Sequence, residues 1–256
     1  MSTPTHPAYG RLREVTPAAS VLLENNPNMM TLDGTNSWVL RAPGDPYCVV
    51  VDPGEDDAEH RALLAACAPV ALVLLTHHHP DHASGAARFA EVVDAPVRAF
   101  DPELCSRGAD ALVEGEVVQP AGLSLRVLHT PGHTDDSVCL LGDGIALTGD
   151  TVLGRGTTVL HHLGDYLGSL RGLAELPPDT VGLPGHGPEL ADLPATAREY
   201  LDHRQRRLDQ VSAALEELGP DAAVRQIVEH VYADVDPALW APAEHSVRAQ
   251  LDYLRG

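Results

Sequence analysis

The 256-residue sequence contains no lysine, so all 17 of its Lys or Arg residues are arginines. Aspartate and glutamate number 37, which gives a formal net charge of −20 at pH 7. This excess opposes non-specific binding to nucleic acid and to anionic membranes, because both are negatively charged. A nucleic-acid substrate is therefore disfavoured, although a local basic patch would still permit one.

Cysteine is also scarce, and the four residues present are far apart: Cys48, Cys67, Cys105 and Cys139. None forms a Cys-x-x-Cys pair, so we expect small core side chains in a reducing cytoplasm, not disulfides or metal ligands. No apolar run approaches the roughly 20 residues that a membrane helix needs. Residues 1–13 lack the apolar segment of a secretory signal, which favours a cytoplasmic location.

Short apolar runs alternate with helical patterns up to about residue 190. Strands are expected at residues 15–23, 37–41, 47–51, 70–75, 96–100, 123–128, 138–141, 145–148 and 181–183, and helices at 58–67, 84–93 and 165–173. The Gly-Asp-Gly at 142–144 predicts a hairpin between two of these strands. The pattern predicts an α/β fold in which two sheets pack face to face with helices outside.

The sequence becomes entirely helical in character beyond Pro194. Apolar residues recur on one helical face up to Leu218, and Gly219-Pro220 ends that helix. Two further helices are expected around residues 224–231 and 247–254. We therefore divide the chain into a main domain, residues 1–195, and a small C-terminal helical module, residues 196–256.

The most informative stretch is Thr-His-His-His-Pro-Asp-His at residues 76–82, directly after a buried-strand pattern. Loops at the C-terminal ends of strands usually carry the chemistry of α/β folds. His77 and His79 point the same way in extended backbone, and the residue between them points the opposite way. Asp81 and His82 follow as the chain turns into a helix. Imidazoles and a carboxylate this close suit a divalent metal, most often zinc.

Three later loops each place one further donor beside glycine after an apolar strand. A first metal would take His77, His79 and His133, and a second would take Asp81, His82 and His186, with Asp150 bridging both. Two metals roughly 4 Å apart would share a water or hydroxide, lower its pKa and stabilise the developing charge. Asp81 would both ligate a metal and orient this nucleophile. Gly132 and Gly185 would let the backbone approach the site closely.

For several other polar residues, the sequence allows both a structural and a functional role. His78 is either a substrate contact or simply exposed, and His129 is more typical of a structural histidine. Exposure is favoured for His161 and His162. The tightest basic cluster is Arg204, Arg206 and Arg207, for which a solvated helix face, a partly buried guanidinium at Arg204 and phosphate contacts all remain open.

Four motifs occur in the order found in the metallo-β-lactamase superfamily: residues 76–82, Thr-Pro-Gly-His-Thr at 130–134, Thr-Gly-Asp at 148–150 and Pro-Gly-His-Gly at 184–187. With Asp52, they resemble this superfamily over residues 15–190. The resemblance implies an αββα sandwich and a site for two Zn²⁺ ions per chain. Asp81 beside His82 resembles the glyoxalase II and ribonuclease Z branch. The cysteine ligand of the best-known β-lactamases, near Asp150, is absent.

A closer resemblance is to the group of β-lactamase-like protein 2, carried by residues 26–36, 132–136, 154–159 and 200–204. It implies that the C-terminal module is winged-helix-like. Some members of that group are endoribonucleases, and related enzymes are thioesterases that release acyl chains from carrier proteins. The sequence departs from the group at His78 and Ser137, two positions that could line the substrate pocket.

We therefore predict a zinc-dependent hydrolase of the metallo-β-lactamase superfamily with two metal ions. Its expected substrate is a thioester or ester, either a small molecule or a carrier-bound acyl group. The alternative is a zinc-dependent endoribonuclease acting on single-stranded RNA. A non-catalytic metal-binding or partner-binding module is a third possibility, against which the complete ligand set argues.

Overall fold

The computed structural model describes residues 6–233, 235–237 and 240–255. Six strands form one sheet in sequence order: β1 (Arg13–Thr16), β2 (Ala19–Leu23), β3 (Asn36–Leu40), β4 (Cys48–Val51), β5 (Val70–Leu74) and β6 (Val97–Arg98). The second sheet has the order β11-β10-β9-β8-β7, with β7 (Val117–Val118), β8 (Leu125–His129), β9 (Val138–Leu141), β10 (Ile145–Gly149) and β11 (Val181–Pro184). Both the two sheets and the predicted β9–β10 hairpin are confirmed.

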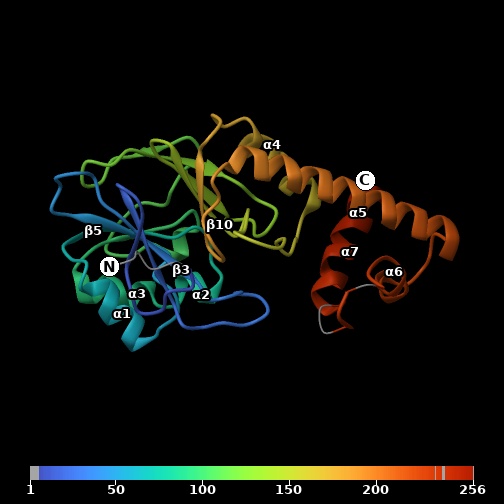
Figure 1. Cartoon of the computed structure of the whole chain (residues 1–256), viewed down its shortest axis with the longest axis horizontal. Helices are drawn as coiled ribbons and strands as arrows, with labels where there is room; N and C mark the ends of the chain where they lie inside the picture. Colours follow the sequence, from blue (N-terminus) through green and yellow to red (C-terminus); the bar gives the residue numbers. More distant parts are fainter. Residues whose placement is uncertain (1–5, 234, 238–239, 256) are drawn as a thin grey trace.

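The helices lie outside the two sheets (Figure 1). Those of the first sheet are α1 (Ala58–Ala65), α2 (Pro80–Ala83) and α3 (Ala86–Val93), followed by the short 3-10 helix η1 (Pro102–Leu104). The second sheet is covered by α4 (Leu163–Ala174) and the start of α5 (Leu193–Leu218), after which come α6 (Val224–Val231) and α7 (Trp240–Arg255). No helix among the described residues has both the length and the apolarity that crossing a membrane requires.

The main core lies between the sheets, where alternate side chains of both inner faces meet. Trp38, Val49 and Leu74 of the first sheet pack there with Leu140 and Leu147 of the second. Two further apolar clusters separate each sheet from its helices. This layering is the predicted αββα sandwich, and burial of this much apolar surface supplies most of the free energy that favours folding.

Two predicted elements are interrupted in the structure. The strand expected at residues 15–23 is a hairpin, in which β1 and β2 pair antiparallel. The helix expected at 84–93 begins only at Ala86, and the separate turn α2 precedes it. The break falls at Gly85, where an added Cβ would lie 2.4 Å from the carbonyl oxygen of Glu55. Close approach of two backbones, which sequence periodicity does not report, causes this break.

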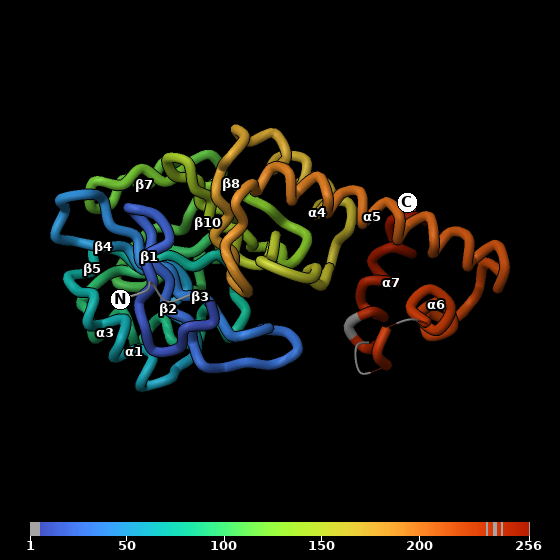
Figure 2. The backbone as a smooth tube through the Cα atoms, in the orientation of Figure 1, coloured from blue at the N-terminus to red at the C-terminus, as the bar shows by residue number. Residues whose placement is uncertain are grey.

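Helix α5 connects the sandwich to the C-terminal module (Figure 2). Asp192 caps its first turn by accepting the N–H of Ala195 at 2.9 Å, and Gly219 follows its last residue. Its first half packs against α4, and its second half forms a separate core with α6 and α7 that includes Val211 and Ile227. The division predicted after residue 195 falls within the first turn of α5 and stays a prediction.

A buried carboxyl group secures the loop that leads to the polar end of the sandwich. Glu24 accepts the N–H of Glu55 at 3.1 Å and the side-chain amide of Asn26 at 3.3 Å. Asn26 in turn bonds both the backbone and the hydroxyl of Thr35, and that hydroxyl donates to Asp81 at 3.2 Å. Burial raises the pKa of Glu24 to about 7. At pH values between the pKa of an unfolded glutamate and about 7, Glu24 therefore takes up a proton when the chain folds.

We expect Glu24→Gln to change how stability depends on pH. Because the pKa of Glu24 is higher in the folded state, its contribution falls as pH rises from about 4.5 to about 7, by roughly 1–3 kcal/mol. Urea unfolding at pH 5 and pH 7.5 should show the variant gaining stability relative to the natural protein at the higher pH. Glu91→Gln, which neutralises an exposed glutamate of α3, is the control; the same pH trend in both variants would contradict the assignment to Glu24.

Candidate metal centre

Seven donor side chains meet at one edge of the sandwich, where loops from both sheets end. They form two groups, His77, His79, His133 and Asp150, and Asp81, His82 and His186, whose ligand atoms lie within 4.8 Å of one another in each group. These are the seven residues predicted from the sequence. Asp150 lies between the groups, with Oδ2 3.3 Å from His186 Nε2 and 3.7 Å from His133 Nε2. This is the position that a bridging carboxylate requires.

The loop after β5 and the one-turn helix α2 position four of these donors. His79 precedes Pro80, whose fixed φ suits the first position of a helix. The single turn of α2 then brings Asp81 and His82 toward the second group, and His82 is completely buried. The change from extended strand to helix thus distributes neighbouring residues between two groups.

A buried aspartate at the end of β4 orients two of the imidazoles. Asp52 accepts the N–H of Thr76 at 2.8 Å and its hydroxyl at 2.6 Å. It also accepts Nδ1 of His82 at 3.0 Å. The Thr76 hydroxyl donates its only proton to Asp52. The hydroxyl oxygen can therefore only accept a hydrogen bond from Nδ1 of His77, which lies 3.0 Å away. Both imidazoles therefore carry a proton on Nδ1, which turns Nε2 toward the other donors.

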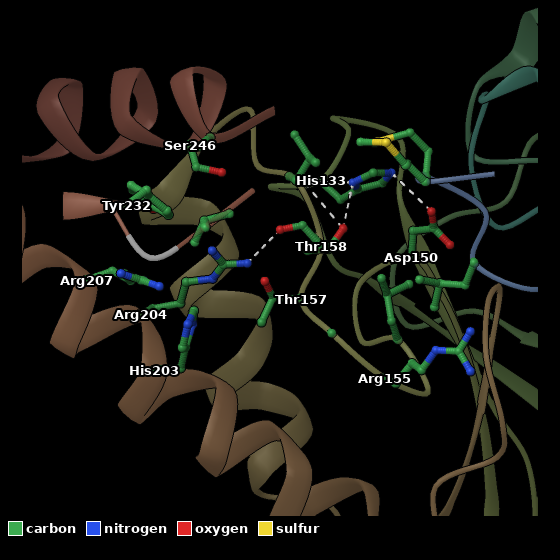
Figure 3. Close-up of a pocket in the computed structure, with 18 residues that line it drawn as sticks. His133, Asp150, Arg155, Thr157, Thr158, His203, Arg204, Arg207, Tyr232 and Ser246 are labelled. Atoms are coloured by element: carbon green, nitrogen blue, oxygen red, sulfur yellow. Dashed lines mark hydrogen bonds and ion pairs between the residues drawn. The ribbon is translucent and has the colours of Figure 1, made fainter. Parts of the chain in front are cut away.

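Backbone carbonyls orient two further imidazoles in the same way. His133 Nδ1 lies 2.9 Å from the oxygen of Val159, with the Thr158 hydroxyl also at 3.0 Å (Figure 3). His186 Nδ1 lies 3.1 Å from the oxygen of Gly34. A carbonyl oxygen can only accept, so Nδ1 of each ring carries a proton and Nε2 faces the other donors. Acceptors of this kind beside ligating histidines are typical of metal sites.

Ring nitrogens of the five histidines face one another at short range. His79 Nδ1 lies 3.1 Å from His77 Nε2 and 3.0 Å from His133 Nε2, and His82 Nε2 lies 3.3 Å from His186 Nε2. Nitrogen lone pairs at this separation repel unless a proton or a metal cation lies between them. The residues present therefore fit a metal centre, since five imidazoles and two carboxylates are suitable donors for zinc.

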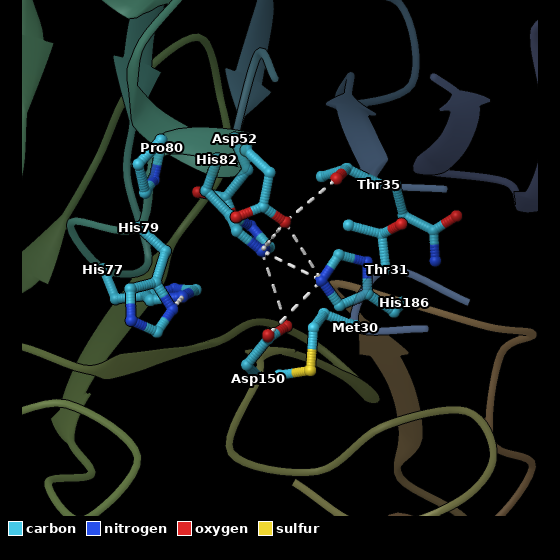
Figure 4. Close-up of polar contacts among 12 residues, drawn as sticks. Met30, Thr31, Thr35, Asp52, His77, His79, Pro80, His82, Asp150 and His186 are labelled. Carbon is cyan, nitrogen blue, oxygen red and sulfur yellow. Dashed lines mark hydrogen bonds and ion pairs between the residues drawn. The ribbon is translucent and has the colours of Figure 1, made fainter. Parts of the chain in front are cut away.

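The electrostatics of the site also favour a bound cation (Figure 4). Burial would raise the pKa of Asp150, but His186 and His82 hold it well below the usual range. Burial would lower the pKa of His186, yet Asp150 and Asp81 raise it to about 9. Burial and the neighbouring His133 lower the pKa of His79 to about 4. The same negative field that retains a proton on His186 attracts a metal cation, which competes with that proton.

Gly185 makes room for the donors, in agreement with the sequence-based expectation. A Cβ at this position would lie 2.4 Å from Asp150 Oδ1 and 2.6 Å from His82 Cε1. Gly132 allows a similar approach, because its Cβ would lie 2.4 Å from the Cβ of Tyr166. Asp150 Oδ1 is buried and has no hydrogen-bond partner in the described part of the chain. A metal ion at this point would satisfy that oxygen.

The remaining polar residues singled out from the sequence lie outside the two groups. His78 points away from them, with Nδ1 2.6 Å from Asp136 Oδ1. It lines a separate hollow together with His161 and His162, which are both exposed. His129 is structural, since its ring stacks on Phe100 at 4.1 Å between centroids. The carbonyl acceptors leave no mark in the sequence, because any residue type can supply a backbone oxygen.

The family model for the metallo-beta-lactamase superfamily matches residues 30–186. The model for the beta-lactamase associated winged helix domain matches residues 223–255. An atrochrysone carboxyl ACP thioesterase from Aspergillus fumigatus is 31% identical, and the match covers 89% of this chain and 79% of the relative. The beta-lactamase-like protein 2 homolog of Drosophila melanogaster is 28% identical over 97% of this chain and 90% of its own.

Solved structures show the same fold over almost the whole chain. A beta-lactamase domain protein from Burkholderia ambifaria superposes with a TM-score of 0.84 at 24% identity, covering 98% of this chain and 89% of that one. A metallo-beta-lactamase family protein from Thermus thermophilus superposes with a TM-score of 0.74 at 25% identity, covering 94% of both chains. The family match and the predicted fold agree, and the chain belongs to the metallo-beta-lactamase superfamily, with a winged-helix-like domain at its C-terminal end.

Proposed function

We propose that this protein is a dinuclear zinc hydrolase that cleaves acyl thioesters into a carboxylic acid and a thiol. The observation that carries the proposal is the arrangement of seven donors in two adjoining groups, with imidazole nitrogens facing inward. The relatives named as acyl-carrier thioesterases support the choice of substrate. They share 31% and 32% identity over 89% and 90% of this chain.

Each metal position has its own residues. His77, His79 and His133 would hold the first ion, Asp81, His82 and His186 the second, and Asp150 would bridge them. Bound zinc ions would supply a water of lowered pKa and polarise the carbonyl under attack. In the overall reaction the water oxygen bonds to the carbonyl carbon and the carbon–sulfur bond breaks. One proton of that water ends on the departing thiolate.

Asp81 is the candidate catalytic residue of the chain. The Thr35 hydroxyl donates to its Oδ2 at 3.2 Å, which fixes the carboxylate at the partly open side of the site. Burial would raise its pKa, but His186 and His82 hold it well below the usual range. The ionised carboxylate can therefore accept a hydrogen bond from the attacking water and orient it.

A pocket of about 360 Å³ next to the donors suits an acyl substrate better than RNA. It extends from His133 and Asp150 toward the C-terminal module. Its apolar lining includes Leu32, Leu153 and Val159, and the exposed Met30 lies at its edge. Flexible apolar side chains of this kind can pack against acyl chains of different shapes. The net charge of −20 also disfavours a polyanion.

The purified protein should hold about two zinc ions per chain when all seven donors ligate. Gly185→Ala should lose most of this metal, because the new methyl group would displace Asp150 and His82. Gly168→Ala is the matched control, since its Cβ would meet nothing within 4 Å. Elemental analysis measures both variants. Less than one ion per chain in the natural protein, after reconstitution with zinc, would rule out the dinuclear site. Iron in place of zinc would show that the metal was wrongly identified.

Substrate class can be tested with a thiol-release assay on acyl thioesters, beside a cleavage assay on single-stranded RNA. We expect thioester turnover and a loss of roughly 100-fold or more in kcat for Asp81→Asn, which can no longer accept as an anion. If the natural protein cleaves RNA but turns over no thioester, and Asp81→Asn abolishes the RNA cleavage, the protein is a ribonuclease and not a thioesterase. RNA binding of that kind should weaken steeply as salt increases.

A further inference from the structure

A buried cation lies in the wall of the pocket at the end away from the donors. Arg204 is only 3% exposed. Its Nη2 donates to the oxygen of Thr158 at 2.7 Å, and its guanidinium carbon lies 5.3 Å from the centre of the Tyr166 ring. Its Nε has no hydrogen-bond partner, and no carboxylate of the described residues forms an ion pair with it. A buried charge without an opposite charge is costly, so this arrangement calls for a ligand.

Two more arginines and a histidine of α5 lie near this end: His203 and Arg207 line the pocket, and Arg206 lines an adjoining hollow. The half-buried Arg207 donates to Gln210 at 2.9 Å and lies 4.4 Å from the centre of the Tyr232 ring. Arg206 is exposed, and Nδ1 of His203 is buried without a partner. Burial and the neighbouring arginines lower the pKa of His203 to about 4, so its imidazole is neutral near pH 7. We call Arg204, Arg206 and Arg207 the α5 basic cluster. Positive charge is gathered here in a chain whose formal net charge is −20.

The α5 basic cluster adjoins the donors of the metal centre. Thr158 connects them, because its oxygen accepts from Arg204 and its hydroxyl lies 3.0 Å from His133 Nδ1 (Figure 3). His203 and Arg207 also line a second hollow of about 290 Å³ with Arg206, so the pocket continues along α5. A molecule that reacts at the metal centre can therefore reach the cluster with its other end.

A separate hollow, lined in part by His78, has more acidic residues in its wall. It measures about 580 Å³ and is lined by Asp101, Asp135 and Asp136 together with three histidines, among them His78. Carboxylates gathered in a hollow repel an anionic substituent. The negatively charged end of a substrate would thus be directed to the α5 side.

We propose that the α5 basic cluster binds an anionic group of the substrate, at the end remote from the scissile carbonyl. Two sources share this chemistry: a phosphate on the thiol carrier, as in coenzyme A or phosphopantetheine, and a carboxylate on the acyl group. Arginine suits both, because its planar guanidinium can donate two parallel hydrogen bonds. The inference rests on the proposed thioesterase function. It adds that the preferred thioester carries an anionic group, which the pocket recognises.

The test compares thioesters that share a reacting acetyl group but differ in charge: acetyl coenzyme A and neutral S-acetyl-N-acetylcysteamine. A third substrate, the N-acetylcysteamine thioester of succinic acid, carries its charge on the acyl side. We expect at least one charged thioester to be preferred in kcat/KM by about tenfold or more over the neutral one. Preference for the coenzyme A ester assigns a phosphate, and preference for the succinyl ester assigns a carboxylate.

Arg207→Gln and Arg206→Gln should each reduce that preference by severalfold to tenfold, mainly through the KM of the charged thioester. Arg198→Gln is the control, because it removes the same charge from an exposed position of α5 outside the pocket. Equal kcat/KM for charged and neutral thioesters would overturn the proposal. An equal effect of Arg198→Gln would also overturn it, since that would indicate only the general field of the protein.

Calorimetric binding of two pairs of unreactive thioethers separates this inference from the proposed function. If the anionic group is a phosphate, S-ethyl coenzyme A should bind the zinc-loaded protein more tightly than S-ethylpantetheine, and if it is a carboxylate, S-(3-carboxypropyl)-N-acetylcysteamine should bind more tightly than its S-propyl analogue; Arg207→Gln should remove either difference. That result with no turnover of any thioester would retain the anion subsite and reject the thioesterase. Equal affinity within both pairs of thioethers, together with salt-sensitive binding of single-stranded RNA, would reject the subsite in favour of a nucleic-acid phosphate.

Discussion

The carboxylate of Asp52 is the interaction on which the polar end of the molecule depends. It lies at the end of β4, is 1% exposed, and accepts from both donors of Thr76 and from His82. These contacts join a strand, the loop after β5 and α2 at one point. They also place a proton on Nδ1 of His77 and His82, and hence turn Nε2 of each ring toward the other donors. The two sheets supply the frame, and this one anion orients the imidazoles that follow β5.

The second sheet contributes its donors with a different kind of support. His133 and His186 are oriented by the carbonyls of Val159 and Gly34, which belong to loops remote in sequence. The loop of Val159 is itself held by Arg204 through Thr158. One helix of the C-terminal half therefore contributes to the orientation of a donor in the sandwich, and the metal centre is not confined to the region matched by the superfamily model.

Much of the fold, and the seven residues that meet at the polar end, could be predicted from the sequence, because strand periodicity and loop motifs are local properties. The break at Gly85 could not, since it results from contact with Glu55 in another loop. The sequence spacing of Arg204 placed it on an apolar helical face, but its carbonyl partner on Thr158 is 46 residues away. Contacts between distant segments, and backbone acceptors without a residue signature, are what local patterns leave undetermined.

The shared position of α5 has a consequence for how such proteins diversify. Its first half belongs to the core over the second sheet and its second half to the core with α6 and α7. Exchanging the C-terminal portion between homologues would alter the wall of the pocket and, through the contact of Arg204 with Thr158, the loop beside His133. Chimeras that retain both Arg204 and Thr158 keep this contact beside His133. In chimeras that lack one of the two residues, the loop beside His133 needs another contact to hold it. The wall of the pocket and the loop beside His133 are therefore inherited together in this architecture.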